Sequence, residues 1–189
     1  MATLTRLGVP GDEDVWSALG FTIEGRAVDI GQVRCVVGDT GWGFDEILSD
    51  PAVLGIETVR CPPAVGAVHA NGVTHVDHVV YAVRELDAAI ADLTAVLGTP
   101  PRRRFHPRGP TGPEMAFYRV GEAFIEVVAT GAAPALIGLA LWSADLDATV
   151  AVIRSHGGPI SEPKPAVQGG RIASVWHGHL DWGLAVMGR

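Results

Sequence analysis

The chain has 189 residues, of which 48% are hydrophobic and 19% are charged, so it can form a sizeable core and is not a disordered segment. The formal net charge is −7 and no long basic run occurs, which argues against binding to nucleic acid or to an anionic membrane surface. The longest apolar runs reach about half of the roughly 20 residues that a membrane-spanning helix needs, and residues 1–11 lack the apolar centre of an export signal. The two cysteines, Cys35 and Cys61, lie outside any CxxC motif, so we expect reduced thiols in a cytoplasmic protein.

Residues 1–60 contain the signals of one helix and several strands. Thr3–Val9 favours a strand, and the acidic segment Asp12–Leu19 favours a short helix. Further strands are predicted at Phe21–Asp29, Gln32–Val37 and Gly41–Ile47. This order is βαβββ, and we interpret residues 1–60 as a degenerate module of that type.

Residues 61–73 are rich in Pro, Gly, Ala and Asn, which predicts an exposed connection. A clearer βαβββ module follows at residues 74–130. Its helix is predicted to begin after Glu85, to carry apolar residues at i, i+4 and i+7, and to end at Gly98. Its later strands are predicted at Arg102–His106, Glu114–Val120 and Ala123–Ala129.

The same arrangement recurs 60 positions later, at residues 131–189. Without a gap, Leu86, Asp87, Ala88, Ala91 and Gly98 recur as Leu146, Asp147, Ala148, Ala151 and Gly158. In this copy the later strands are predicted around Ile160–Glu162, Arg171–His177 and Trp182–Met187. The sequence therefore predicts an α+β fold of tandem βαβββ modules.

Three motifs of the middle module point to a known family. The run Thr74-His-Val-Asp-His-Val-Val-Tyr-Ala-Val is followed by Glu85-Leu-Asp-Ala-Ala and later by Phe124-Ile-Glu-Val-Val. Together they resemble the vicinal oxygen chelate superfamily, which includes glyoxalases, epimerases, extradiol dioxygenases and bleomycin-resistance proteins. The resemblance implies a curved mixed or antiparallel sheet with helices on its outer face and a metal or ligand on its concave face.

The resemblance also identifies two candidate metal ligands, His78 and Glu126, at positions where metal-using members place a histidine and a glutamate. An imidazole and a carboxylate suit one divalent ion such as Zn, Ni, Fe or Mn. In the alternative without metal, His78 donates to a backbone carbonyl and Glu126 pairs with an arginine. The matching positions of the last module are Gly138 and Ala185, so one chain supplies fewer than the three ligands usual for a catalytic zinc ion.

An odd number of modules suggests an association between chains, because two modules normally complete one cleft. If the middle modules of two chains faced one another, His78 and Glu126 of both chains would supply four ligands. We therefore expect a homodimer.

Four other side chains are candidates for binding a ligand directly. Trp142 and Trp176 lie on predicted strands of the last module and could stack on a flat ligand, or they could belong to the core. Arg104 and His106 lie in an arginine-rich strand that is either a solvated sheet edge or a site for an anionic group.

Two functions follow from these residues, both with a small molecule as ligand or substrate and without nucleic acid or membrane. The first is a glyoxalase-like lyase, isomerase or epimerase assisted by one divalent ion at His78 and Glu126. The alternative is a metal-free protein that binds or sequesters a small molecule, as bleomycin-resistance proteins do. The sequence identifies no catalytic base, and it lacks the GxSxG and phosphate-loop motifs.

Overall fold

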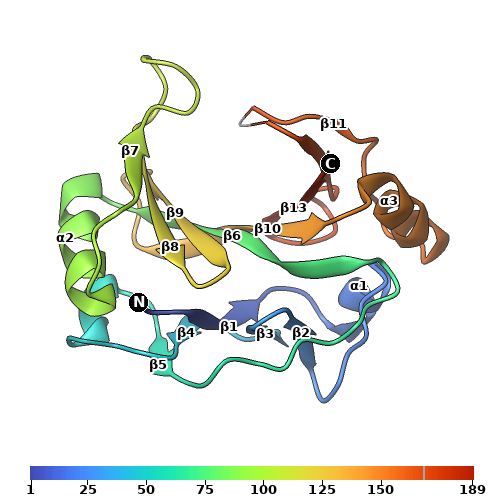
Figure 1. Ribbon diagram of the computed structural model, residues 1–189, viewed down its shortest axis with the longest axis horizontal. Coiled ribbons are helices and arrows are strands. Elements are labelled where there is room, and N and C mark those ends of the chain that lie inside the picture. The colour runs from blue at the N-terminus through green and yellow to red at the C-terminus, as the bar shows by residue number, and fades with distance from the viewer. Residues whose placement is uncertain (168) are drawn as a thin grey trace.

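Two β-sheets packed face to face form the body of the protein (Figure 1). The computed structural model describes residues 1–167 and 169–189. The larger sheet is curved, and helices α2 and α3 lie at its two sides while the smaller sheet lies beneath its middle (Figure 1). This architecture confirms the predicted α+β class. None of the helices in the described residues is long and apolar enough to cross a membrane.

The large sheet has eight strands in the order β11-β12-β13-β10-β6-β9-β8-β7. Its first half comprises β6 (Val73–Val83), α2 (Leu86–Leu97), β7 (Arg103–Phe105), β8 (Met115–Val120) and β9 (Ala123–Ala129). Its second half comprises β10 (Ala135–Ser143), α3 (Leu146–Ser155), β11 (Lys164–Pro165), β12 (Arg171–Ser174) and β13 (Gly183–Gly188). In each half the last strand runs parallel to the first, β9 to β6 and β13 to β10, so the predicted tandem βαβββ modules are confirmed.

The two halves join through antiparallel pairing of β6 with β10. His78 lies opposite Ala140, and Val80 lies opposite Gly138. A local twofold axis therefore relates each residue of β6 to the residue of β10 that lies 60 positions later, which is the spacing of the sequence repeat. The middle module has its partner within its own chain. The hypothesis that the middle modules of two chains face one another is therefore wrong, and the prediction of a dimer loses the argument on which it was based.

Both long helices begin where the sequence predicts, and α2 also ends there, whereas α3 ends at Ser155 with His156 as its C-cap, before the predicted Gly158. The Glu85 side chain accepts hydrogen bonds from the backbone N–H groups of Asp87 and Ala88 in α2, and Asp145 accepts one from that of Ala148 in α3. Gly98 ends α2 with φ of 69°, a left-handed conformation that glycine adopts without strain. The apolar stripe of each helix is buried against the large sheet.

The strand predicted around Ile160–Glu162 is the main local correction in the last module. Ile160 makes only an isolated bridge, with Val175, and the edge strand β11 forms later, at Lys164–Pro165. Prolines at 159, 163 and 165 have no N–H group to donate to a neighbouring strand, so this edge cannot form a long ladder.

The small sheet has five strands in the order β2-β3-β1-β4-β5. Its elements are β1 (Leu4–Val9), α1 (Glu13–Ser17), β2 (Ala27–Ile30), β3 (Val33–Val37), β4 (Trp42–Phe44), the short helix η1 (Pro51–Leu54) and β5 (Thr58–Arg60). Strand β3 is parallel to β1, β4 is antiparallel to β1 on its other side, and β5 is parallel to β4. These are the relations of β9, β10 and β13 in the large sheet. Residues 1–60 therefore have the connectivity of parts of two shortened modules, rather than of the single βαβββ unit expected.

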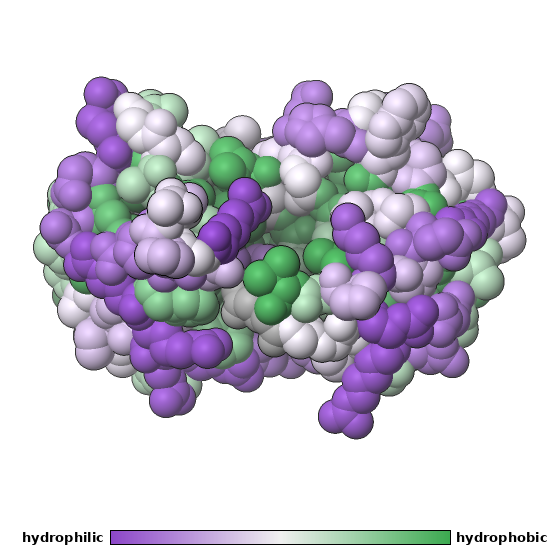
Figure 2. Space-filling view, turned by 90° about the horizontal axis from the view of Figure 1, so that it is seen from above, coloured by the Kyte–Doolittle hydropathy of each residue, from purple (hydrophilic) through white to green (hydrophobic). Residues whose placement is uncertain are grey.

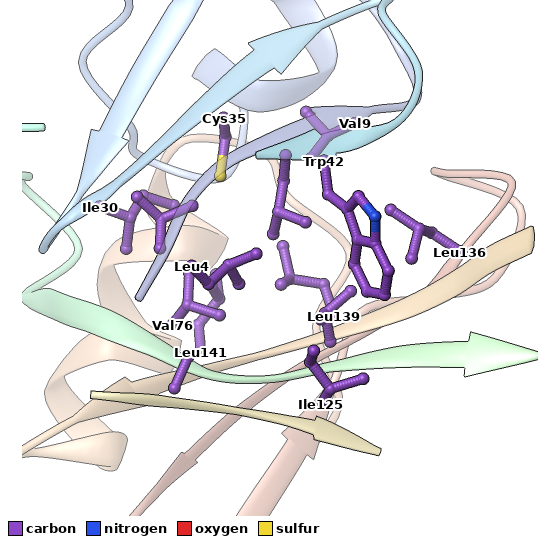
Figure 3. Packing of buried hydrophobic residues seen from close by; sticks show 14 of the residues in the cluster. Leu4, Val9, Ile30, Cys35, Trp42, Val76, Ile125, Leu136, Leu139 and Leu141 are labelled. Atoms are coloured by element: carbon purple, nitrogen blue, oxygen red, sulfur yellow. The ribbon is translucent and has the colours of Figure 1, made fainter. Parts of the chain in front are cut away.

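The core lies between the two sheets. Leu4, Ile30 and Trp42 of the small sheet face Ile125 and Leu141 of the large sheet (Figure 3), and all five side chains are buried. The small sheet thus covers the convex face of the large one and leaves the concave face open.

The two thiols are free, as the sequence predicts. Cys35 is completely buried in the core, and this burial raises the pKa of its thiol to about 12.

Leu141→Ala should destabilise the protein by about 2–5 kcal/mol, because it removes a fully buried side chain from the layer between the sheets. Val65→Ala is the matched control, since Val65 is 90% exposed in the connection. Urea unfolding of the two variants checks this. Equal free energies of unfolding would contradict the two-sheet core.

His69 should make the stability depend on pH. Its Nε2 atom donates to the Asp29 carbonyl (3.0 Å), and its Nδ1 atom accepts from the Thr22 backbone N–H (3.3 Å). Burial lowers the pKa of His69, so the unfolded chain binds a proton at its ordinary pKa of about 6.5 while the folded chain still resists it. The free energy of unfolding should fall as the pH drops below about 6.5, and His69→Gln should reduce that dependence. An unchanged pH dependence in a folded His69→Gln protein would contradict this assignment.

Candidate functional site

The concave face of the large sheet forms a cleft of about 600 Å³. Figure 2 looks onto this face, where apolar side chains gather in a hollow and hydrophilic ones stand around it. The residues that define the cleft come from both modules and include Asp77, His78, Phe117, Glu126, Trp142 and Met187.

His78 and Glu126 meet in this cleft. Glu126 lies opposite Val80 on the neighbouring strand, so its side chain is on the same face as that of His78. His78 Nε2 is 3.9 Å from Glu126 Oε2, and both side chains are about one-fifth exposed. The structure therefore brings together the two residues that the sequence singles out, from strands that are remote in the chain.

Asp77 also lines the cleft, and the sequence reasoning missed it. Successive side chains of a regular strand point to opposite faces, so Asp77 was not expected beside His78. Strand β6 has a bulge here, because Leu141 pairs with Val76 and Ala140 with His78. Asp77 Oδ2 consequently lies 2.7 Å from His78 Nδ1.

Positive side chains stand at the mouth of the cleft. Arg103, Arg108 and Lys164 line it, and all three are exposed. Arg103 lies on β7 with its guanidinium carbon 5.5 Å from the centre of the Phe105 ring. The run of arginines at 102–104 left a solvated sheet edge and an anion site as alternatives, and alternation along the strand directs Arg103 toward the cleft.

Arg104 and His106 do not line the cleft. Arg104 points to the other face, where it forms ion pairs with Asp87 and with Glu114 and holds the pKa of Glu114 below its usual range. His106 Nδ1 donates to the Gly112 carbonyl (2.8 Å) within its own loop. The prediction that these two side chains bind a ligand is not supported by their positions.

The two tryptophans have different places. Trp142 lines the cleft and stacks on His75, with ring centres 6.2 Å apart. Trp176 is 74% exposed and is not among the residues that line the cleft; it lies two residues beyond the end of β12 at Ser174. Of the two tryptophans, Trp142 alone is placed where it could stack on a flat ligand in the cleft.

A small apolar cluster fills the side of the concave face that belongs to the middle module. Its buried members are Ala82, Met115, Phe117 and Val128, and Phe105 stacks on Phe117 with ring centres 5.1 Å apart. Glu126 lies beside this cluster, opposite Phe117. A carboxylate in such surroundings is costly to leave without polar partners, which favours a functional role.

The residues present do not fit a resident catalytic metal ion. The twofold relation places Gly138 and Ala185 where the last module would need a histidine and a glutamate, and neither side chain can bind a metal. Asp77 contacts the His78 nitrogen remote from Glu126 and adds no third ligand beside Nε2. Within the described residues, no group of three or more His, Cys, Asp or Glu could hold a metal ion. Two ligands are fewer than a catalytic zinc site normally has.

The sequence comparisons show the family. A model of the Glyoxalase/Bleomycin resistance protein/Dioxygenase superfamily matches residues 77–174, which is slightly more than half of the chain. The chain belongs to this superfamily, as the motifs of the middle module indicated. No curated protein matched the chain.

Solved structures with the same fold include two epimerases. Methylmalonyl-CoA epimerase from Mycobacterium tuberculosis is 22% identical, with 65% of this chain and 92% of that chain covered and a TM-score of 0.53. A variant of the Streptomyces coelicolor epimerase, in complex with 2-nitronate-propionyl-CoA, is 19% identical, with coverage of 61% and 97% and a TM-score of 0.50. A hypothetical protein from Bacillus halodurans is 15% identical, with coverage of 60% and 93% and a TM-score of 0.50. At these identities the likeness shows the fold alone.

The twofold axis predicts a gain of metal binding in the double variant Gly138→His plus Ala185→Glu. With His78 and Glu126 it would supply four ligands around one point, so about one zinc ion per chain should bind at least tenfold more tightly than to the unchanged protein. Calorimetric titration with zinc checks this. The control is Gly138→His plus Ala185→Gln, which replaces the added carboxylate with an amide of similar size. The added Cβ at 138 meets the Gly183 carbonyl oxygen and Val80 Cγ2, each at 3.2 Å, so adding Val80→Ala relieves the contact with the side chain if the double variant folds poorly.

Two outcomes would contradict the assignment of two ligands to this site and the twofold relation behind it. One is a folded double variant, by circular dichroism, that binds zinc no better than the unchanged chain. The other is an unchanged chain that already retains one tightly bound ion held by Glu126.

Proposed function

We propose that the protein binds a small anionic molecule with an apolar or flat body in the cleft, and that Glu126 and His78 transfer a proton on it, as an isomerase or epimerase does. The observation that carries the proposal is the carboxylate and imidazole, 3.9 Å apart, at the floor of a cleft with aromatic walls and a cationic mouth. The middle and last modules, residues 74–130 and 131–189, complete this cleft, so the proposal needs no second chain.

The acid–base pair suits proton transfer because each group can accept a proton and return it. Glu126 is partly buried beside Phe117, where water competes less for a reacting proton. Since the chain supplies two ligands, the proposed steps use its own side chains and none is assigned to a metal ion. The metal-assisted reaction expected from the resemblance is not proposed.

The cationic mouth suits a carboxylate or phosphate group of the ligand. Arg103 and Arg108 can bind such a group with paired hydrogen bonds, and Lys164 faces the cleft from the other module. The Streptomyces coelicolor relative was solved with an acyl-CoA compound, a class that carries phosphates. Acyl-CoA thioesters and small 2-substituted carboxylates are therefore the first compounds to test.

A second function, binding without turnover, is favoured by the flat surfaces in the cleft. Trp142 stacks on His75, and Phe105 stacks on Phe117. Such surfaces can enclose an aromatic molecule, as expected of a protein that sequesters a drug. Both functions share the cleft and differ in whether a proton moves.

Proton exchange in heavy water tests the proposal. The protein is incubated with methylmalonyl-CoA and a panel of 2-substituted carboxylates, and NMR follows deuterium entering the carbon next to the carbonyl. At least one compound should exchange, and Glu126→Gln should slow the exchange by about 10²–10⁴-fold. Glu162→Gln is the control, because Glu162 is an exposed carboxylate paired with Arg154.

Ligand binding separates the two functions. Quenching of tryptophan fluorescence reports binding beside Trp142, and Trp142→Phe shows whether that residue carries the signal. Binding of an aromatic compound without exchange of any compound would favour sequestration over catalysis. Absence of both binding and exchange would contradict the proposed use of the cleft.

A further inference from the structure

Three equivalent strands of the fold carry a bulge at the same place. In β1 the pairing with β4 skips Thr5, in β6 the pairing with β10 skips Asp77, and in β10 the pairing with β6 skips Ile137. Asp77 and Ile137 are 60 positions apart and correspond by the twofold axis. The bulge is therefore a feature of the fold itself. It directly precedes Arg6 in β1, His78 in β6 and Gly138 in β10.

A bulge changes which side chains can meet. The extra residue lets two successive side chains share one face of the sheet. In β6 these are Asp77 and His78, which both line the cleft. In β10 they are Ile137 and Gly138, which have no polar side chain. Only the middle module uses the bulge to place a carboxylate beside an imidazole.

We infer that Asp77 is a positioning residue that fixes the ring of His78 with its proton on Nδ1. The 2.7 Å contact joins Asp77 Oδ2 to His78 Nδ1, and a carboxylate can only accept, so the neutral ring donates from Nδ1. The Nε2 atom of the neutral ring then carries a lone pair and faces Glu126.

The distance to Glu126 agrees with this tautomer. The 3.9 Å between His78 Nε2 and Glu126 Oε2 is longer than a hydrogen bond. If the proton were on Nε2, the ring would donate to Glu126, which would draw the two groups together and make that carboxylate a weaker base. With the proton on Nδ1, two acceptors face each other and leave room for a proton donor.

This arrangement defines the chemistry of a substrate at the floor of the cleft. A substrate that presents an O–H group or an acidic C–H group there would donate its proton to one of the two acceptors. The catalytic consequence rests on the proposed function, whereas the tautomer is a property of the protein alone and can be measured without a ligand.

NMR of the imidazole nitrogens tests the inference directly. Spectra recorded in mildly alkaline solution, with the His78 signals assigned by their loss in His78→Gln, should show the proton on Nδ1 in the unchanged protein. In Asp77→Ala the proton should move largely to Nε2, the form that predominates in free histidine, and Asp77→Asn should give a mixture. Ile137→Asn, at the equivalent bulge of β10, should leave the His78 signals in the Nδ1–H pattern.

The spectra decide the inference even if no substrate is found. A proton on Nε2 in the unchanged protein, or an unaltered tautomer in folded Asp77→Ala, would overturn it. If the tautomer shifts as expected but no compound exchanges protons, the proposed function fails and the positioning role stands. If a compound does exchange, Asp77→Asn should lower kcat at least about tenfold with little change in KM.

Discussion

The antiparallel pairing of β6 with β10 is the constraint on which the rest of the structure depends. It joins two βαβββ modules of one chain into a single curved sheet, and it sets the twofold relation between residues of β6 and β10 that are 60 positions apart. The convex face that results is apolar and is covered by the small sheet. The concave face is left open as the cleft, with His78 near its centre because that residue pairs with Ala140 across the join.

The twofold relation also explains why the site is one-sided. A symmetric pair of modules could supply a histidine and a glutamate from each half, but the second half has Gly138 and Ala185 at those positions. What remains is a single imidazole between two carboxylates, Asp77 on one nitrogen and Glu126 near the other. This set suits the handling of protons better than the holding of a metal ion. The positive residues at the mouth add a preference for anionic ligands.

Much of the fold could be predicted from the sequence because its signals are local and repeated. The acidic starts of α2 and α3, their apolar stripes and the glycine after α2 define two helices at a fixed spacing, and strands alternate around them. The meeting of His78 and Glu126 follows from the family motif. The bulge at Asp77 could not be predicted, since it depends on how β6 pairs with a strand about 60 residues away. Arg104 was a candidate because three arginines adjoin in sequence, but which of them faces the cleft depends on the face that each takes in β7. There Arg103 lines the cleft.

The small sheet shows where local patterns give too little information. Its strands are three to six residues long, and which side of β1 each one joins is decided by packing between sheets rather than by propensity. Nothing in the sequence distinguishes Trp42 and Leu4 from other strand residues, yet in the structure they form part of the surface that packs on the large sheet (Figure 3).

The central claim, that one chain completes the cleft by itself, can be tested by isotope-filtered NMR on a mixture of labelled and unlabelled protein that has been unfolded and refolded together. The contacts between β6 and β10, such as Val79 with Leu139, should appear only within labelled chains. Strong contacts between a labelled and an unlabelled chain across this strand pair would show that the modules pair between molecules and would contradict the account.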